Sequence, residues 1–396
     1  MMANSKQFKP KLKTRGYIMQ RVLAPVLTAA VAVLLTQACA QSETVIEDSI
    51  GTEYHTVRLV EVIGNLEHPW AVAFLPDESM LVTERPGRLL HVQDGEPTNL
   101  SGVPEVVSIG QGGMLDVAVH PDYEENGWVY LTYAEGSSDG TATTLARGRI
   151  DGDTFTDVEV LFQQDRHSSP GRHYGSRLVF MDDGTLLMSI GDRGADPPRA
   201  QDLGDHAGSV LRLNDDGSPA EGNPFLDVDY IHDEIYSYGH RNIQGLDIDR
   251  QTGLIWKTNH GPRGGDTLNV IEPGKNYGWP IVSRGRDYGT EEQWGRGRER
   301  DGMEQPVWEF LPTLAPSGLA VVRGDQFPDW EGNLLAGGLA SQQIQRIVVE
   351  GRTVVHIEAL LLQEIGRIRD VRVGPDGNIY IVTDHSDGAV YRLEPA

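Results

Sequence analysis

The stretch that decides the fold is GRHYGSRLVFMDDGTLLMSIGDRG, residues 171–194. Its second half has the pattern of a β-hairpin, because two apolar runs flank an Asp-Asp-Gly turn. Its first half is unusual, since His173 and Arg177 stand at the mouth of an apolar strand. The stretch therefore predicts antiparallel β-structure, with polar side chains gathered where a strand begins.

The same pattern recurs along the chain. Each unit is an apolar strand, a turn of the Pro-Asp or Asp-Gly kind, a second apolar strand and a polar stretch. The six units are residues 70–84, 114–133, 176–192, 243–261, 317–339 and 368–385. They predict an all-β fold, a six-bladed β-propeller of four-stranded antiparallel blades, with residues 56–64 completing the last blade. A β-sandwich is the alternative, which six similar units disfavour.

The N-terminus has the order of a secretory signal: basic residues, then an apolar run over 22–36, then Gln-Ala-Cys-Ala-Gln at 37–41. The run is too short and too rich in alanine to predict a transmembrane helix. We expect residues 1–40 to be a cleaved signal peptide and 41–396 to be one exported propeller domain, periplasmic or secreted. A lipid anchor through Cys39, the only cysteine, is the alternative.

The formal net charge is −24, and removal of the six basic residues of the signal segment brings it to −30. So acidic a surface argues against nucleic acids and anionic membranes as partners. It fits a soluble exported protein, and its simplest role is to keep the protein in solution.

In a propeller, polar residues that precede the first strand of each blade converge at one end of the axis. Several units carry such residues at this place: Gln111, His173, Arg241, Asn242, Arg367 and Arg369. Guanidinium groups bind carboxylates in bidentate fashion, and a histidine can take up a proton near neutral pH. A single histidine or arginine at such a position more often has a structural role than a functional one. Their recurrence at one place in the repeat predicts a pocket for a small, planar polyanion.

Six segments together resemble the soluble sugar dehydrogenases that depend on pyrroloquinoline quinone (PQQ), most closely the aldose sugar dehydrogenases of bacterial periplasms. They are GQGGMLDVAVHPDY, HYGSRLV, YGHRNIQGLD, NHGPRGGDTLN, GKNYGWP and GRIRDVRVGPDGNIY, in a resemblance that spans roughly residues 60–394. The resemblance implies a six-bladed propeller with PQQ and Ca²⁺ at its axis. It also implies oxidation of an aldose at C1 to a lactone. The electron acceptor is expected to be a separate partner, because the chain has no C-x-x-C-H haem motif.

The resemblance also assigns roles to residues. His173 matches the general base and Arg241 the cation beside the reacting quinone oxygen. The cofactor contacts that it implies, besides Arg241, are Gln111, Asn242, Tyr288, Leu339, Ala340, Ser341, Arg367 and Arg369. The backbone carbonyls of Gly261 and Pro262 match the ligands of the cofactor's Ca²⁺, a hard cation that prefers oxygen.

Two departures from the family pattern stand out. The glucose-oxidising branch places a lysine where this chain has Ala340, which leaves only backbone or Ser341 to contact PQQ there. The aldose branch binds a further structural Ca²⁺ through an acidic residue where this chain has Thr267, although Tyr277 is retained. Asp266 is the candidate substitute, and the second metal stays open.

Two other classes of function are compatible with such a propeller. One is a Ca²⁺-dependent lactonase or other hydrolase, which would place several carboxylates around its metal. The other is a propeller that binds a ligand without catalysis. The predicted excess of arginine disfavours the hydrolase, and the presence of both His173 and Arg241 disfavours the non-catalytic protein.

Overall fold

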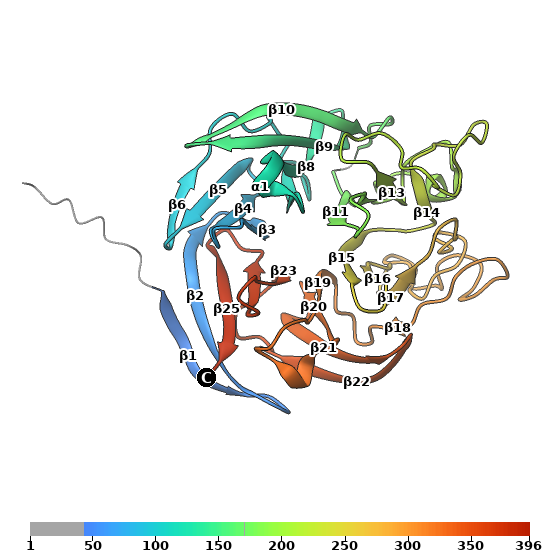
Figure 1. Cartoon of the computed structure of the whole chain (residues 1–396). Helices are drawn as coiled ribbons and strands as arrows, with labels where there is room; N and C mark the ends of the chain where they lie inside the picture. Colours follow the sequence, from blue (N-terminus) through green and yellow to red (C-terminus); the bar gives the residue numbers. More distant parts are fainter. Residues whose placement is uncertain (1–42, 170) are drawn as a thin grey trace, which may run out of the picture. The chain divides into compact units, whose positions relative to one another are not determined.

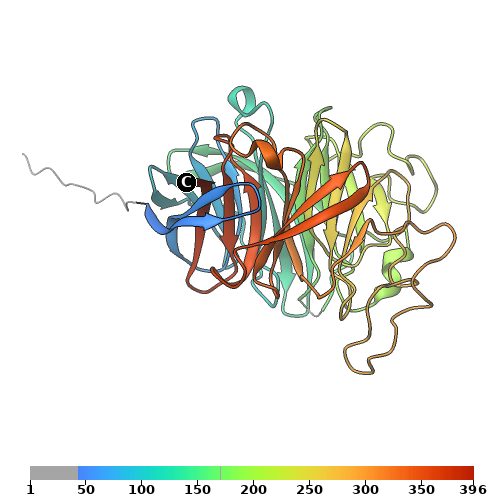
Figure 2. The ribbon, with the colours of Figure 1, turned by 90° about the horizontal axis from the view of Figure 1, so that it is seen from below.

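The computed structural model describes residues 43–169 and 171–396, so the predicted signal segment and Cys39 lie outside the described residues. In the described part the strands form six antiparallel sheets that follow one another around a ring (Figure 1). Seen from below, the sheets stand side by side with their strands roughly upright (Figure 2). The predicted six-bladed β-propeller is confirmed.

The first five blades each contain four consecutive strands. Blade 1 contains β3 (Pro69–Phe74), β4 (Met80–Glu84), β5 (Arg88–Gln93) and β6 (Glu96–Asn99). Blade 2 contains β7 (Met114–Val119), β8 (Val129–Ser137), β9 (Gly140–Asp151) and β10 (Thr154–Gln163). Blade 3 contains β11 (Gly175–Phe180), β12 (Leu186–Ile190), β13 (Ser209–Leu213) and β14 (Ile235–Tyr238). Blade 4 contains β15 (Ile243–Asp249), β16 (Leu254–Asn259), β17 (Thr267–Ile271) and β18 (Trp308–Glu309). Blade 5 contains β19 (Pro316–Val321), β20 (Leu334–Gly338), β21 (Gln343–Glu350) and β22 (Thr353–Leu360).

Blade 6 closes the ring with strands from both ends of the described chain. Its inner strands are β23 (Ile368–Val373), β24 (Ile379–Thr383) and β25 (Gly388–Pro395), and β2 (Thr56–Leu66) pairs with β25. The prediction that residues 56–64 complete this blade is therefore confirmed. β1 (Thr44–Gly51) pairs with β2 and adds a fifth strand, which the four-stranded pattern did not predict.

Helical structure is sparse among the described residues. It comprises α1 (Tyr123–Asn126) and the short 3₁₀ helices η1 (Pro197–Gln201) and η2 (Pro328–Trp330). None of the helices in this part of the chain has the length and apolar character that crossing a membrane requires.

The innermost hairpins form where the apolar runs and the turn residues predict them. In blade 3, the Asp183 carboxylate accepts a hydrogen bond of 3.0 Å from the backbone N–H of Thr185, and Gly184 adopts φ +81°. In blade 6, Asp376 accepts an equivalent bond of 3.0 Å from Asn378. The aspartate side chain satisfies a turn donor, and glycine adopts the left-handed φ without steric cost.

The core lies between neighbouring blades. One apolar cluster joins Trp128 and Tyr130 of blade 2 to Leu178, Leu186 and other side chains of blade 3. Because each sheet buries its faces against its neighbours, a blade alone would expose them to water. Ring closure therefore supplies much of the burial that stabilises each blade.

Charged groups are buried around the propeller axis. Arg177 of β11 is 1% exposed and lies 2.9 Å from Asp370 of β23 and 3.3 Å from Asp116 of β7. Arg372 of β23 lies 2.8 Å from Asp116 and 2.9 Å from Asp370. These four residues are called the axial ion cluster. Arg177 therefore belongs to this cluster, whereas the sequence pattern placed it with His173 at the polar site.

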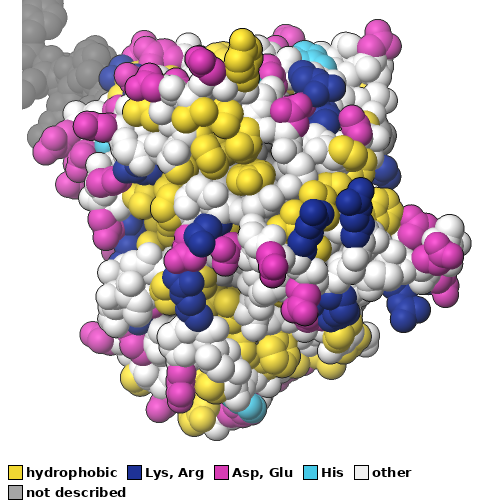
Figure 3. Space-filling view, turned by 90° about the vertical axis from the view of Figure 1, so that its right-hand side faces the viewer, with side chains coloured by type: hydrophobic (Ala, Val, Ile, Leu, Met, Phe, Trp, Pro, Cys, Tyr) yellow, Lys and Arg dark blue, Asp and Glu magenta, His cyan; other side chains and the backbone are white. Residues whose placement is uncertain are grey.

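The outer surface shows charges of both signs. On the side that lies at the right of Figure 1, basic, acidic and apolar side chains are interspersed (Figure 3). No single basic field dominates this view, as expected for a chain of formal net charge −24.

The axial ion cluster leads to a stability prediction. Asp116→Asn removes a buried charge that faces both arginines of the cluster, and we expect it to lower the free energy of unfolding by about 3–5 kcal/mol. Denaturant unfolding measures the change. Asp157→Asn is the control, because Asp157 pairs with Arg149 at the surface, and its expected loss is within about 1 kcal/mol. Equal losses in the two variants would contradict a structural role for the cluster.

Candidate active site

A cavity of about 210 Å³ lies at one end of the axis, and all six blades or their connecting loops contribute to its wall. Among the predicted cofactor contacts, the wall includes Gln111, Asn242, Leu339, Arg367 and Arg369. It also includes three side chains of interest that were not among those predicted contacts: Arg85, His260 and Asp384. The structure therefore brings the polar residues of separate repeats together at the axis.

One side of the cavity carries an excess of positive charge. Asp384 accepts hydrogen bonds from Arg369 at 2.7 Å and from Arg367 at 3.2 Å. Burial alone would raise the pKa of Asp384, but Arg369, Arg85 and Arg367 hold it well below its ordinary value. One ionised carboxylate thus faces three guanidinium groups, which leaves this part of the wall cationic.

Several buried nitrogen atoms in the wall have no hydrogen-bond partner among the described residues. They are Nε of Arg85, Nε of Arg369 and Nε2 of His260. Burial, with smaller contributions from Arg241 and His173, lowers the pKa of His260 to about 4, so this imidazole is neutral at neutral pH. Buried polar atoms without partners are costly. Oxygen acceptors of a ligand would satisfy the two arginine N–H donors, whereas Nε2 of the neutral His260 can act as an acceptor.

His173 lies beside the cavity and is hydrogen-bonded to a buried carboxylate. Its Nδ1 is 2.6 Å from Oδ1 of Asp192, which is 1% exposed. The other oxygen of Asp192 accepts a bond of 2.7 Å from the indole N–H of Trp279. The backbone N–H of His173 donates to the Gln111 side chain at 2.8 Å, so Gln111 also fixes this loop.

These contacts determine the protonation of His173. Burial lowers its pKa, with help from Arg241 and Arg172, and Asp192 only partly opposes this shift. The imidazole is therefore neutral at neutral pH, with Nδ1–H donated to Asp192. Nε2 is then left as a proton acceptor. Asp192 is not among the site residues predicted from the sequence, where its only signal is the polar Gly-Asp-Arg-Gly stretch that directly follows a buried strand.

Arg241 and Asn242 are held by blade 4. The side chain of Asn259 accepts hydrogen bonds from the backbone N–H groups of both residues, at 3.2 and 2.9 Å. Nη1 of Arg241 donates to the carbonyl of His260 at 3.4 Å, and its guanidinium lies 5.3 Å from the Trp279 ring centroid. Arg241 is thereby positioned between the His173–Asp192 pair and the His260 loop.

Besides Arg241, three predicted contact residues do not line the cavity. Tyr288 is 61% exposed, and Ala340 is exposed as well. The hydroxyl of Ser341 donates to the carbonyl of Leu314 at 3.3 Å. None of the three contributes to the cavity wall as it stands in this structure.

The loop after β16 contains the predicted calcium ligands Gly261 and Pro262, both buried. The carbonyl of Pro262 also accepts a hydrogen bond of 2.8 Å from Gly265. Asp266 accepts bonds from Gly261 at 3.1 Å, from Ala315 at 2.8 Å and from the Thr313 hydroxyl. Asp266 thus ties this loop to the start of blade 5.

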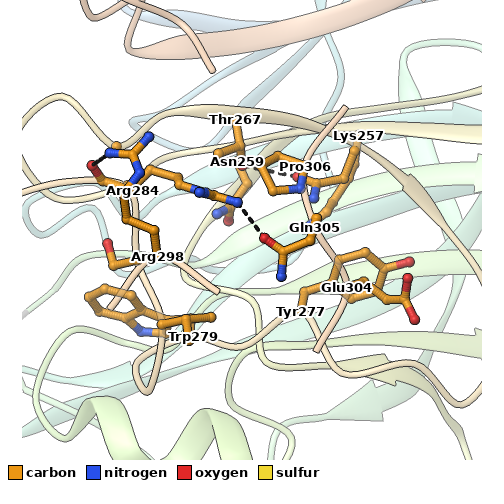
Figure 4. A pocket seen from close by; sticks show the side chains of 15 residues that line it. Lys257, Asn259, Thr267, Tyr277, Trp279, Arg284, Arg298, Glu304, Gln305 and Pro306 are labelled. Atoms are coloured by element: carbon orange, nitrogen blue, oxygen red, sulfur yellow. Dashed lines mark hydrogen bonds between the residues drawn. The ribbon is translucent and has the colours of Figure 1, made fainter. Parts of the chain in front are cut away.

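Tyr277 and Thr267 line a second cavity of about 50 Å³ (Figure 4). The hydroxyl of Tyr277 already donates to the Val270 carbonyl at 2.7 Å. The buried Lys257 lies over the Tyr277 ring at 4.4 Å, and Arg284 and Arg298 also line this cavity. Asp266 does not line it. These residues do not fit a second Ca²⁺ held jointly by Asp266 and Tyr277, because Asp266 lies outside the cavity that Tyr277 lines and its carboxylate already accepts three hydrogen bonds.

A further group of titratable residues lies away from the axial cavity. His206 contacts Asp165 at 3.0 Å through Nδ1 and Glu234 at 2.7 Å through Nε2. Burial would lower the pKa of His206, but these carboxylates raise it to about 9. Its ring also stacks on His232 at 3.8 Å, an arrangement in which one metal ion cannot lie in both ring planes. His206 is therefore a protonated imidazole held between two carboxylates.

The axis of this six-bladed propeller thus holds a cationic cavity beside a neutral histidine that is hydrogen-bonded to a buried carboxylate. A family model described as glucose/sorbosone dehydrogenase matches residues 66–392. The chain therefore belongs to the glucose/sorbosone dehydrogenase family.

Individual relatives agree with this assignment. The chain is 40% identical over 347 residues to aldose sugar dehydrogenase YliI of Escherichia coli, across 86% of this chain and 93% of the relative. The crystal structure of the soluble aldose sugar dehydrogenase from Escherichia coli in its apo-form matches with a TM-score of 0.83 and 39% identity, across 86% and 100% of the two chains. The PQQ-bound form of the aldose sugar dehydrogenase from Streptomyces coelicolor matches with a TM-score of 0.71 and 29% identity, across 87% and 100%.

The His173–Asp192 contact leads to a prediction that does not require activity. Asp192→Asn removes the carboxylate that raises the His173 pKa, so we expect the already low pKa of this imidazole to fall further. Titration of the histidine side chains by NMR measures it. An unchanged His173 pKa would contradict the assigned contact, and the titration of exposed His356 serves as the internal control.

Proposed function

We propose that this chain is a quinoprotein that oxidises aldose sugars at C1 to lactones, with PQQ as its cofactor. The observation that carries the proposal is the axial cavity. Its wall carries three guanidinium groups and unpartnered buried nitrogens, and the neutral His173 lies directly beside it, next to the lining residues Tyr174 and Gly175. Membership of the family and the PQQ-bound relative support the same assignment.

PQQ fits the residues that line the cavity. A planar cofactor with carboxylates would take hydrogen bonds from Arg367 and Arg369, and a remaining acceptor would take one from the amide of Asn242. When bound, PQQ supplies an electrophilic quinone that accepts a hydride equivalent. The chain's own part in catalysis is to orient the sugar, to take up its proton and to hold a fixed cation nearby.

His173 acts as the general base in this proposal. Nε2 takes the proton of the sugar's C1 hydroxyl while C1 gives up its hydrogen as hydride, and the C1–O bond becomes the lactone carbonyl. Asp192 holds the imidazole by Nδ1–H and stabilises the imidazolium that forms. Arg241 provides positive charge where negative charge develops, in a site largely shielded from water.

The proposal includes one Ca²⁺ held through the buried loop of Gly261 and Pro262. Backbone carbonyl oxygens are ligands that Ca²⁺ prefers, and the ion would add Lewis acidity at the quinone. Asp266 supports this site indirectly, since it fixes the loop through the N–H of Gly261.

The lining of the cavity does not favour the hydrolase alternative. Asp384 is the one carboxylate among the residues that line it, and two arginines already bind this group. A hydrolase that activates water on Ca²⁺ would instead need several free carboxylates around the ion.

We also propose that residues 1–40 direct export and that the electrons pass to a separate acceptor. Support for export comes from the charged, apolar and small-residue order of residues 6–41. Support for a separate acceptor comes from the sequence, which has no haem attachment motif.

Reconstitution tests the proposal directly. The mature chain is purified without cofactor, PQQ and Ca²⁺ are added singly and together, and dye reduction is followed with a panel of aldoses. We expect activity only when both are present. Absence of PQQ binding would refute the quinoprotein assignment and favour the hydrolase.

A base variant tests the role of His173. In His173→Ala we expect kcat to fall by at least about 100-fold, because the general base is lost, while PQQ affinity stays close to wild type. His356→Ala is the matched control, since His356 is exposed and bonds to Glu53. Normal turnover in His173→Ala would show that another group accepts the proton.

A further inference from the structure

Arg85 is a basic residue in the cavity wall to which the proposed function has so far given no role. It directly follows β4 of blade 1, whereas Arg367 and Arg369 belong to blade 6. We infer that Arg85 completes, with Arg367 and Arg369, a three-arginine site for the carboxylates of a planar polyanion. This inference rests on the proposed function in identifying that polyanion as PQQ.

The hydrogen bonds of Arg85 leave part of its guanidinium free for a ligand. Nη1 donates to the carbonyl of Gly110 at 3.0 Å, and Nε is buried without a partner among the described residues. Asp384 receives its two arginine hydrogen bonds from Arg367 and Arg369. The Arg85 charge contributes to the low pKa of Asp384, yet the structure shows no ion pair between these two groups.

The charge of the cavity wall supports a role in anion binding. Three guanidinium groups face one carboxylate, and a polycarboxylate ligand would neutralise the remainder. Charge-assisted bonds to guanidinium are the strong hydrogen bonds of proteins, particularly where water is excluded. Ala340 is exposed and carries no charge, so it adds no positive charge to the cavity. Arg85 is the basic side chain that the cavity wall provides in addition to Arg367 and Arg369, the pair predicted from the sequence.

The backbone around Arg85 places the side chain firmly. Its N–H donates to the His68 carbonyl at 3.1 Å, and its carbonyl accepts from Met114 at 3.1 Å. Gly113 adopts φ +127°, and a Cβ there would lie 1.9 Å from the Arg85 carbonyl oxygen. Arg85 therefore packs against the Gly110–Gly113 loop, whose Gln111 holds His173.

This packing offers a competing explanation, in which Arg85 only holds the loop. The two roles differ in what a substitution changes. A residue that binds carboxylates affects ligand affinity and its salt dependence. A residue that only holds the loop affects the fold and, through Gln111 and His173, the turnover of the loaded enzyme.

The experiment measures ligand affinity directly in the full mature chain freed of cofactor. Arg85→Gln, Arg85→Lys and wild type are titrated with PQQ and, separately, with trimellitate, a planar aromatic tricarboxylate that has no quinone. Calorimetry or tryptophan fluorescence reports binding. We expect Arg85→Gln to weaken PQQ binding by about 10- to 100-fold, with a smaller loss in Arg85→Lys. The affinity of Arg85→Gln should also fall less steeply with salt than that of wild type.

Two further readouts separate the explanations. The Tm of the cofactor-free form of Arg85→Gln should stay close to wild type, and its kcat when saturated with PQQ should fall by a much smaller factor than its PQQ affinity. Arg88→Gln is the matched control, because Arg88 pairs with Glu84 and Glu67 and does not line the cavity. Its ligand affinity should be unchanged.

Each possible outcome either upholds or overturns the inference about Arg85. Equal PQQ affinity in wild type and Arg85→Gln would overturn the inference, and so would a loss confined to Tm and kcat. Binding of trimellitate through Arg85 without any binding of PQQ would uphold the three-arginine site and refute the proposed function. Failure of wild type to bind either probe would overturn both.

Discussion

In the axial ion cluster, Arg177 and Arg372 each contact both Asp116 and Asp370. These ion pairs determine how closely the inner strands approach one another. A buried charge without a partner is strongly destabilising, so β7, β11 and β23 are held where their charges meet. Arg177 also donates to the carbonyl of Gln244 at 2.7 Å and to that of Arg369 at 3.0 Å. Both of these residues line the cavity, so the axial ion cluster fixes the backbone from which the cavity wall extends.

The six innermost hairpins could be predicted from the sequence because their signals are local. Apolar runs, Asp-Gly turns and a repeat of similar units all indicate the same structure. β1 could not be predicted in this way, since TVIEDSIG is polar and almost entirely exposed. It is a strand because it pairs along the outer edge of β2, which follows it after a short connection, and this pairing leaves no apolar alternation in its own sequence.

The site could be predicted in part, and the misses follow from what a sequence pattern can report. Gln111, Asn242, Arg367 and Arg369 were found because they precede strands that start at one end of the axis. Arg177 is on such a strand too, but only the packing decides whether its side chain lies in the cavity or in the axial ion cluster. Asp192 and Arg85 were missed for a different reason: each stands in a polar turn after a strand, where charged residues are usually solvated.

The last blade joins the two ends of the described chain, and the cationic wall of the cavity spans the same junction. Arg85 and His68 belong to the first blade, while Arg369 and Asp384 belong to the last. A chain leaving the ribosome therefore has no complete cavity until its C-terminal strands have emerged and the ring has closed. Any ligand bound there would bridge the seam of the ring and resist its opening. Binding of any ligand in this cavity would thus come late in folding, and it would also hold the ring together at the one place where the ring is closed by strand pairing and not by the chain itself.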